Sequence, residues 1–259
     1  MPNWCDNYLI VNLSSYNNNC TNEDIDNFYN ENLQKFGDDV YDLDFNCCVP
    51  MPEEIKNSES PSNLDEEKKK ELIDKYGADN WYDWSINNWG TKWNTKDIYC
   101  DRESNGSLTY NFTTPWGPPD KWLLAIINKY PDLEIKLTYE EAGMDFGGEI
   151  HYNGELIMQE QYTLSEHVWE NCDKEFIDKA IAEVVNSEDS NDLCYQNITE
   201  QVIEYISDEI YNAYSIESYI LEYLDEYFEK VKKRDSNNID NVTILEYGDE
   251  GKNIFKLTL

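Results

Sequence analysis

The side chains best suited to metal binding or acid–base chemistry lie between residues 141 and 151. Glu149 and His151 alternate along a predicted strand, so both side chains point to the same face of a sheet. Asp145 and Glu141 precede them, and such a carboxylate-rich set suits a hard divalent cation. The chain has no EF-hand loop, no His-Glu-x-x-His helix and no Walker or Rossmann glycine pattern. A metal-dependent or small-ligand enzyme is therefore an open alternative without a complete motif.

Cysteine and histidine could also supply a nucleophile and its base. The chain has seven cysteines, with no Cys-x-x-Cys pair and no zinc-ligand spacing. It has two histidines, His151 and His167, and no spacing selects a Cys–His pair. With 54 acidic residues, some carboxylate pair must occur by chance. We therefore predict a non-catalytic protein without metal or cofactor, whose cysteines stay reduced.

The stretch from Gln196 to Glu229 carries nine acidic residues and no lysine or arginine. Like charges three or four residues apart destabilise a helix by about 0.2–0.5 kcal/mol per pair, so most solvated helices mix signs. Glu200, Glu204 and Asp208 follow at i, i+4 spacing and predict a row of carboxylates on one helix face. This array could imitate nucleic-acid phosphates toward a cationic groove; the alternative is an acidic helix that serves solubility alone. The candidate partner-binding residues are Glu200, Glu204, Asp208, Glu209, Glu217, Glu222, Asp225, Glu226 and Glu229.

The whole chain shares this acidity. In 259 residues, 54 Asp and Glu stand against 20 Lys and Arg, a formal net charge of -34. Phosphate backbones and anionic lipid surfaces attract basic patches, so we expect no direct contact with nucleic acid or membrane. AT-rich coding would explain the scarce arginine, but it would raise lysine too and cannot produce the negative sign. Because no secretion leader and no apolar run of ~20 residues is visible, we expect a cytoplasmic protein.

The first 162 residues predict an α+β domain. The expected strands cover 7–13, 45–49, 107–113 and 133–139, the helices 21–36 and 120–130, and a strand hairpin 149–162. Strand, helix, strand, strand, helix, strand is the split βαβ order of ferredoxin-like folds. A further amphipathic helix over 64–76 should end at Gly77.

From residue 165 the pattern changes to helices. Phe176 to Val185 forms an apolar stripe, and 198–231 predicts one long helix or two helices broken near Ser215. A polar linker is expected at 188–192, and two strands near the end of the sequence predict a closing β-hairpin. We therefore expect two domains, 1–164 and 165–259, the second an acidic helical extension closed by that hairpin.

Four short motifs rich in aromatic residues, proline and glycine lie in the first domain. They are Pro2-Asn3-Trp4-Cys5 with Asn7; Asn88 to Trp93; Phe112 to Trp116 with Pro118 and Pro119; and Tyr139 to Glu141 with Gly143, Phe146 and Gly148. In this order they resemble the YubB-type ferredoxin-like family of plasmids and bacteriophages, over residues 1 to about 162. The resemblance implies the fold and an origin on a mobile element, and it implies no reaction.

The tryptophans of these motifs allow two interpretations. Trp4, Trp89, Trp93 and Trp116 could line a ligand pocket in which Lys92 supplies the charge. Alternatively, these large aromatic side chains fill the core of a small α/β domain.

We therefore predict a phage- or plasmid-encoded acidic inhibitor of a host defence nucleoprotein, either a CRISPR effector or a restriction enzyme. As a DNA mimic, it would occupy a basic nucleic-acid-binding groove in the cytoplasm of a bacterial host cell. A metal-dependent or small-ligand-binding enzyme and a non-catalytic soluble accessory protein stay open as alternatives. The target, the stoichiometry and the oligomeric state are not determined by the sequence.

Overall fold

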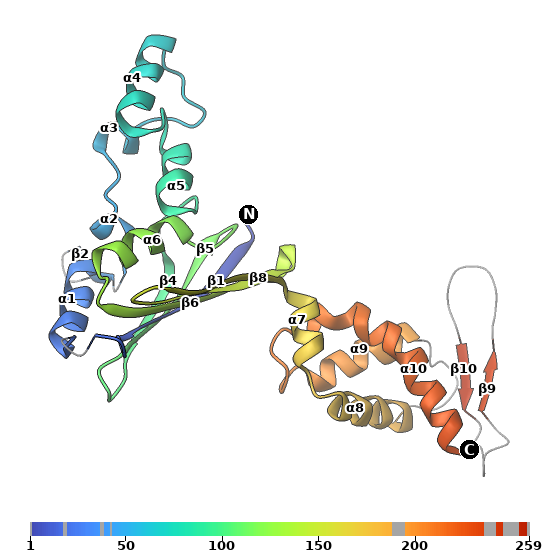
Figure 1. Ribbon diagram of the computed structural model, residues 1–259. Helices are drawn as coiled ribbons and strands as arrows, with labels where there is room; N and C mark the ends of the chain where they lie inside the picture. The colour runs from blue at the N-terminus through green and yellow to red at the C-terminus, as the bar shows by residue number, and fades with distance from the viewer. Residues whose placement is uncertain are drawn as a thin grey trace. The chain divides into compact units, whose positions relative to one another are not determined.

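The fold is described from a computed structural model. It describes residues 2–17, 20–36, 39–41, 43–187, 195–235, 242–245 and 254–257 (Figure 1). The chain divides into two compact units, Met1–Tyr162 and Thr163–Leu259. The predicted linker at 188–192 lies outside the described residues. Among those that are described, no helix is both long and apolar enough to cross a bilayer.

A six-stranded antiparallel sheet forms the centre of the first unit, in the order β4-β5-β1-β6-β7-β8. Its strands are β1 Trp4–Leu13, β4 Lys96–Arg102, β5 Leu108–Pro115, β6 Leu133–Glu141, β7 Phe146–Asn153 and β8 Leu156–Thr163. Strand β1 pairs on both sides, with Leu9 opposite Tyr110 of β5 and Leu137 of β6. The order β4-β5-β1-β6, with helices after β1 and β5, is the split βαβ topology. The predicted α+β class is confirmed.

Two helices cover one face of this sheet because β1, β5 and β6 alternate buried and less buried side chains. Helix α1, Asn22–Asn32, packs Phe28 against Tyr110 of β5, with ring centroids 6.2 Å apart. Helix α6, Asp120–Lys129, buries Trp122, Leu123 and Ile126 in the same core. Helix α1 ends earlier than the sequence pattern predicts, and a short strand pair, β2 Gln34–Phe36 and β3 Asp39–Tyr41, follows.

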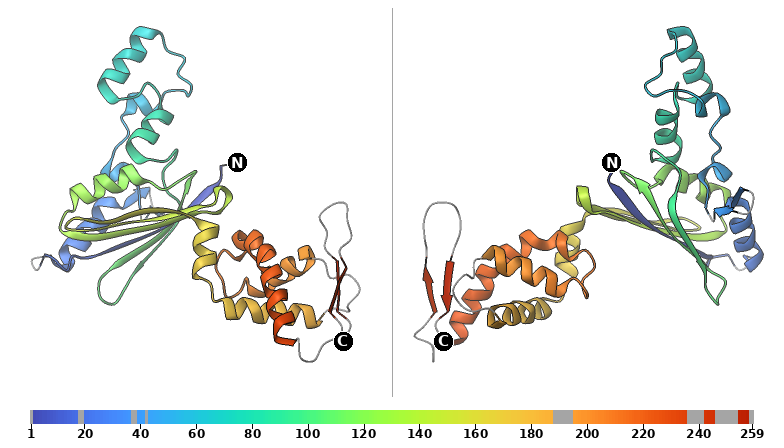
Figure 2. Two further views of the ribbon diagram at one scale, coloured as in Figure 1. Left: turned by 45° about the vertical axis from the view of Figure 1, so that its right-hand side comes forward. Right: turned by 180° about the vertical axis from the view of Figure 1, so that it is seen from behind.

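The segment between β3 and β4 is helical, which corrects the predicted strand at 45–49. Its helices are α2 Phe45–Cys48, α3 Glu53–Lys56, α4 Glu66–Tyr76 and α5 Trp81–Trp89. At α2, the Asp44 carboxylate accepts a hydrogen bond from the Asn46 N–H at 2.7 Å, which caps a helix instead of extending a strand. The place of that strand is taken by β4, which the sequence pattern does not reveal. In Figure 1 and both views of Figure 2, α4 lies away from the sheet at the far end of this segment.

The described helices of the second unit pack around their own apolar core. They are α7 Leu164–Asn171, α8 Lys174–Ser187, α9 Tyr195–Ile206, the 3₁₀ turn η2 Ala213–Ile216 and α10 Glu217–Asp235. The core includes Ile181 of α8, Val202 of α9 and Leu224 of α10. Of the two alternatives for 198–231, the structure shows two separate helices, α9 and α10, with the break near Ser215. Strands β9 Val242–Leu245 and β10 Ile254–Leu257 pair antiparallel, as the hairpin prediction requires.

Gly90 offers a test of how α5 packs on α6. It ends α5 in the left-handed region at φ 86°, and a Cβ there would lie 2.9 Å from the Asp120 backbone nitrogen. Gly77 ends α4 at φ 79° with nothing within 4 Å of such a Cβ. We expect Gly90→Ala to lower the free energy of unfolding by about 2–4 kcal/mol and Gly77→Ala by about 1 kcal/mol. Urea unfolding followed by tryptophan fluorescence measures both, since seven of the eight tryptophans precede residue 163. Equal losses would contradict the close packing at Gly90.

Candidate functional site: an acidic helical surface

All nine acidic residues between Gln196 and Glu229 have exposed side chains. Two lie on α9, two on the connection after it and five on α10. The helices turn their apolar side chains inward, so that Ile198, Val202 and Ile206 of α9 are buried while Glu200 and Glu204 face solvent. The amphipathic pattern of each helix therefore places these carboxylates on the surface.

The predicted row Glu200–Glu204–Asp208 is shorter in the structure. Helix α9 ends at Ile206, and Asp208 and Glu209 lie in turns beyond it. The backbone N–H of Glu209 donates to the Ile206 carbonyl at 3.0 Å, which closes the first of these turns. Only Glu200 and Glu204 therefore form a row on one helix face.

Helix α10 carries the regular array that the sequence suggested for α9. Glu222, Asp225, Glu226 and Glu229 follow at i, i+3, i+4 and i+7, a spacing that places them on one side of the helix. Glu226 also forms an ion pair with Lys230, whose Nζ lies 2.9 Å from the Glu226 Oε1. This lysine is the first base after the base-free stretch, and it offsets one carboxylate at the end of the array.

The start of α9 brings carboxylates of two helices together. The amide of Gln196 donates to Glu200 at 3.1 Å and to Glu217 of α10 at 2.9 Å. The Tyr195 hydroxyl donates to Asp225 at 2.7 Å, and burial together with this carboxylate raises the pKa of the tyrosine. Neutral donors thus hold like charges of α9 and α10 side by side, which a row on one helix could not do.

The residues considered for a metal site have separate partners. Glu149 pairs with Lys136 at 2.7 Å, and His151 Nε2 lies 2.8 Å from Glu134 Oε1. Glu141 accepts a hydrogen bond from the backbone N–H of Gly143 at 3.1 Å. Within the described ranges, no group of three or more His, Cys, Asp or Glu side chains is arranged to hold a metal ion.

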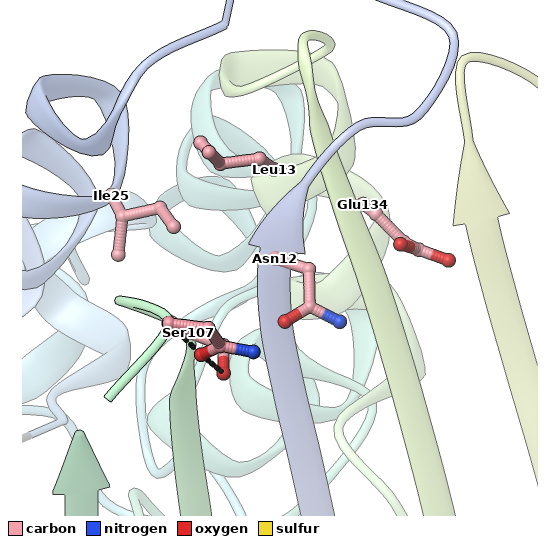
Figure 3. A pocket seen from close by; sticks show the side chains of 6 residues that line it. Asn12, Leu13, Ile25, Ser107 and Glu134 are labelled. Atoms are coloured by element: carbon pink, nitrogen blue, oxygen red, sulfur yellow. Dashed lines mark hydrogen bonds between the residues drawn. The ribbon is translucent and has the colours of Figure 1, made fainter. Parts of the chain in front are cut away.

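A small polar pocket lies where β1 ends and β6 begins (Figure 3). Its volume is about 260 Å³, and its lining residues are Asn12, Leu13, Ile25, Asn105, Ser107 and Glu134. The Asn105 carboxamide oxygen accepts hydrogen bonds from the backbone N–H and hydroxyl of Ser107 at 2.9 and 2.6 Å. Because Glu134 already contacts His151, the pocket offers a small ligand mainly amide and hydroxyl groups.

The aromatic, proline and glycine motifs meet at one end of the sheet. Trp4 stands opposite Pro115 in the β1–β5 register, and the Trp116 N–H donates to the Asn3 carbonyl at 3.0 Å. The Thr91 hydroxyl donates to the Pro115 carbonyl at 2.9 Å, which ties the loop after α5 to β5. Asn7 stands opposite Tyr139 in the β1–β6 register, so four segments distant in sequence build one structural element.

This arrangement separates the tryptophans into two groups. Trp89 is buried, donates from Nε1 to the Val49 carbonyl at 2.9 Å and packs edge-on against Phe45. Trp93 and Trp116 are 39% and 45% exposed. The core interpretation holds for Trp89, whereas Trp93 and Trp116 lie at the surface.

Cys5 shows why the first motif does not provide a nucleophile. Its side chain is fully buried, and burial raises the pKa of the thiol to about 12, with the charges of Asp6 and Glu141 acting in the same direction. Since the thiolate is the reactive form, Cys5 stays protonated and inert at neutral pH.

We expect iodoacetamide at pH 8 to alkylate the half-buried Cys100 in the folded protein and to leave Cys5 unmodified until urea is added. Mass spectrometry of tryptic peptides with and without urea measures this difference. Alkylation of Cys5 in the folded protein as fast as Cys100 would contradict the buried neutral thiol.

Comparison with protein families supports the ferredoxin-like fold and gives no activity. The family described as a ferredoxin-like domain in Api92-like protein matches residues 88–177. The crystal structure of protein Api92 from Yersinia pseudotuberculosis is similar at 23% identity, over 32% of this chain and 30% of that chain, with a TM-score of 0.29. No curated protein matches the chain. Residues 88–177 are thus similar to this ferredoxin-like domain family, for which no activity is given.

Proposed function

We propose that this protein is an acidic binding protein that occupies a basic nucleic-acid-binding groove of a host defence nucleoprotein. The target class would be a CRISPR effector or a restriction enzyme, and the gene would belong to a phage or plasmid, as the YubB-type resemblance implies. The observation that carries this proposal is the surface of nine exposed carboxylates on α9, α10 and their connection, in a stretch without lysine or arginine.

The charge spacing on α10 supports mimicry of a nucleic-acid strand. Seven residues separate Glu222 from Glu229, which is about 10.5 Å along the helix axis at ~1.5 Å per residue. Four carboxylates over this length give a mean axial spacing of about 3.5 Å, close to the ~3.4 Å of helix axis per phosphate of one DNA strand. A groove that binds a phosphate backbone would therefore meet charges of the expected sign and density.

Exposed tyrosines accompany the carboxylates. Tyr205, Tyr211 and Tyr214 have 50%, 70% and 71% of their side chains exposed, on α9 and on the segment leading to α10. Tyrosine is enriched in protein interfaces because it combines a large apolar ring with a hydroxyl group. These rings would contribute contact area, while the carboxylates supply steering and specificity.

The charge of α10 can be removed without changing its shape. In the variant with Glu222→Gln, Asp225→Asn, Glu226→Gln and Glu229→Gln, we expect protection of a targeted phage to fall roughly tenfold or more, because the electrostatic contact is lost. The measurement is the plating efficiency of that phage on bacteria that express the protein together with a CRISPR or restriction system.

A matched control removes the same charge elsewhere. Glu66, Glu67 and Glu71 with Asp74 are four exposed acids of α4, and their amide variant should protect as well as the unchanged protein. Equal loss in both variants would indicate that the acidity serves solubility alone. Full protection by the α10 variant would contradict the mimicry proposal.

A further inference from the structure

A surface of aromatic rings and lysines lies on the first unit, outside the acidic helices. It comprises Trp4 of β1, Trp81 and Tyr82 of α5, Lys92 and Trp93 of the following loop, and Lys96 of β4. We propose that this aromatic–lysine surface binds a nucleotide, with the base stacked on Trp93 and Tyr82 and the phosphate held by Lys92 and Lys96.

Lys92 lies at the centre of this surface. Its Nζ is 4.5 Å from the ring centroid of Trp93, 5.7 Å from that of Tyr82 and 6.0 Å from that of Trp81. No carboxylate in the described part of the chain lies within 4.0 Å of this ammonium group. The rings therefore position a positive charge that has no anionic partner, and a phosphate would provide one.

Lys96 extends the surface over the start of β1. Its Nζ lies 4.7 Å from the ring centroid of Trp4, whose ring is 6.2 Å from that of Trp93. Asp97 is 3.6 Å from Lys96, and both side chains are exposed, so solvent weakens this ion pair. A phosphate between Lys92 and Lys96 would compete with it.

The exposed rings suit the flat face of a base. Trp93 is 39% and Tyr82 37% exposed, although both contact Lys92. Aromatic side chains beside cationic groups form the usual stacking sites for single nucleotides and unpaired strands, because every base has a π face. The exposed rings thus match the base of a nucleotide, and the neighbouring lysines match its phosphate.

The neighbouring sheet surface favours one nucleotide over a strand. Beyond Trp4, the next side chain on the same face of β1 is Asp6, which pairs in register with Glu140 of β6. Asp101 is exposed further along β4. A continuing strand would place its phosphates beside these carboxylates, in a chain of net charge -34.

Equilibrium dialysis of the full chain against adenosine monophosphate, adenosine and an eight-nucleotide deoxyadenylate strand tests the proposal. We expect saturable binding of adenosine monophosphate at micromolar to low millimolar concentration and about tenfold weaker binding of adenosine. The strand should bind no more tightly than the mononucleotide. Tighter binding of the strand would overturn the mononucleotide assignment, and no saturable binding of any of the three would overturn the site.

Two variants locate the binding on this surface. Lys92→Gln should weaken the binding of adenosine monophosphate about tenfold and that of adenosine little. Trp93→Leu should weaken the binding of both ligands about tenfold. The controls are Lys75→Gln, which removes a lysine 4.6 Å from the Tyr76 ring, and Trp116→Leu, which removes another exposed tryptophan. Residue 92 lies at the surface, so Lys92→Gln should leave the fold intact. Unchanged nucleotide binding by this variant would contradict the proposal. Because these residues lie outside α9 and α10, the result is independent of the acidic surface.

Discussion

Repulsion among carboxylates is the constraint on which the rest of this structure depends. A net charge of -34 raises the free energy of any compact state, and the stretch from 196 to 229 has no base to offset it. Apolar burial must therefore hold the second unit together, through a core that joins Ile181, Val202 and Leu224. Because the packed faces of these helices are apolar, the acidic side chains can lie only on the surface. The same constraint that limits stability thus concentrates charge where a partner can reach it.

Hydrogen bonds from neutral donors offset part of the repulsion among these carboxylates. Gln196 donates to Glu200 and Glu217, and Tyr195 donates to Asp225, so carboxylates of α9 and α10 share donors that carry no charge. A lysine in either place would stabilise the helices more, but it would cancel the charge of the surface. The stretch from 196 to 229 contains no base, whereas in the first unit Lys136 pairs with Glu149 and Lys92 lies over the Trp93 ring. The two units therefore present surfaces of different chemistry.

The sequence predicts most of the first unit because its strands alternate and its helices are amphipathic. The strand predicted over 45–49 is wrong, because a five-residue apolar run fits a strand or a short buried helix equally well. The hydrogen bond that Asp44 accepts from the Asn46 N–H favours the helix. Strand β4 escapes prediction because only Ile98 and Cys100 of this edge strand turn toward the core, so its apolar alternation is short and weak. The i, i+4 spacing predicts Asp208 in the same helix as Glu204, but the chain turns after Ile206 and Asn212 adopts φ 60°. Contacts between distant segments, such as Gln196 with Glu217, have no signal in one sequence.

The proposed binding of the α9 and α10 carboxylates to a cationic groove depends on charge and therefore on salt. The most direct measurement is the affinity of the protein for a partner captured from bacterial lysate at low salt, determined between ~50 and ~200 mM sodium chloride. Electrostatic binding predicts a loss of affinity of at least about tenfold over this range, with a smaller loss for the α10 amide variant. An affinity that does not change with salt would contradict the account.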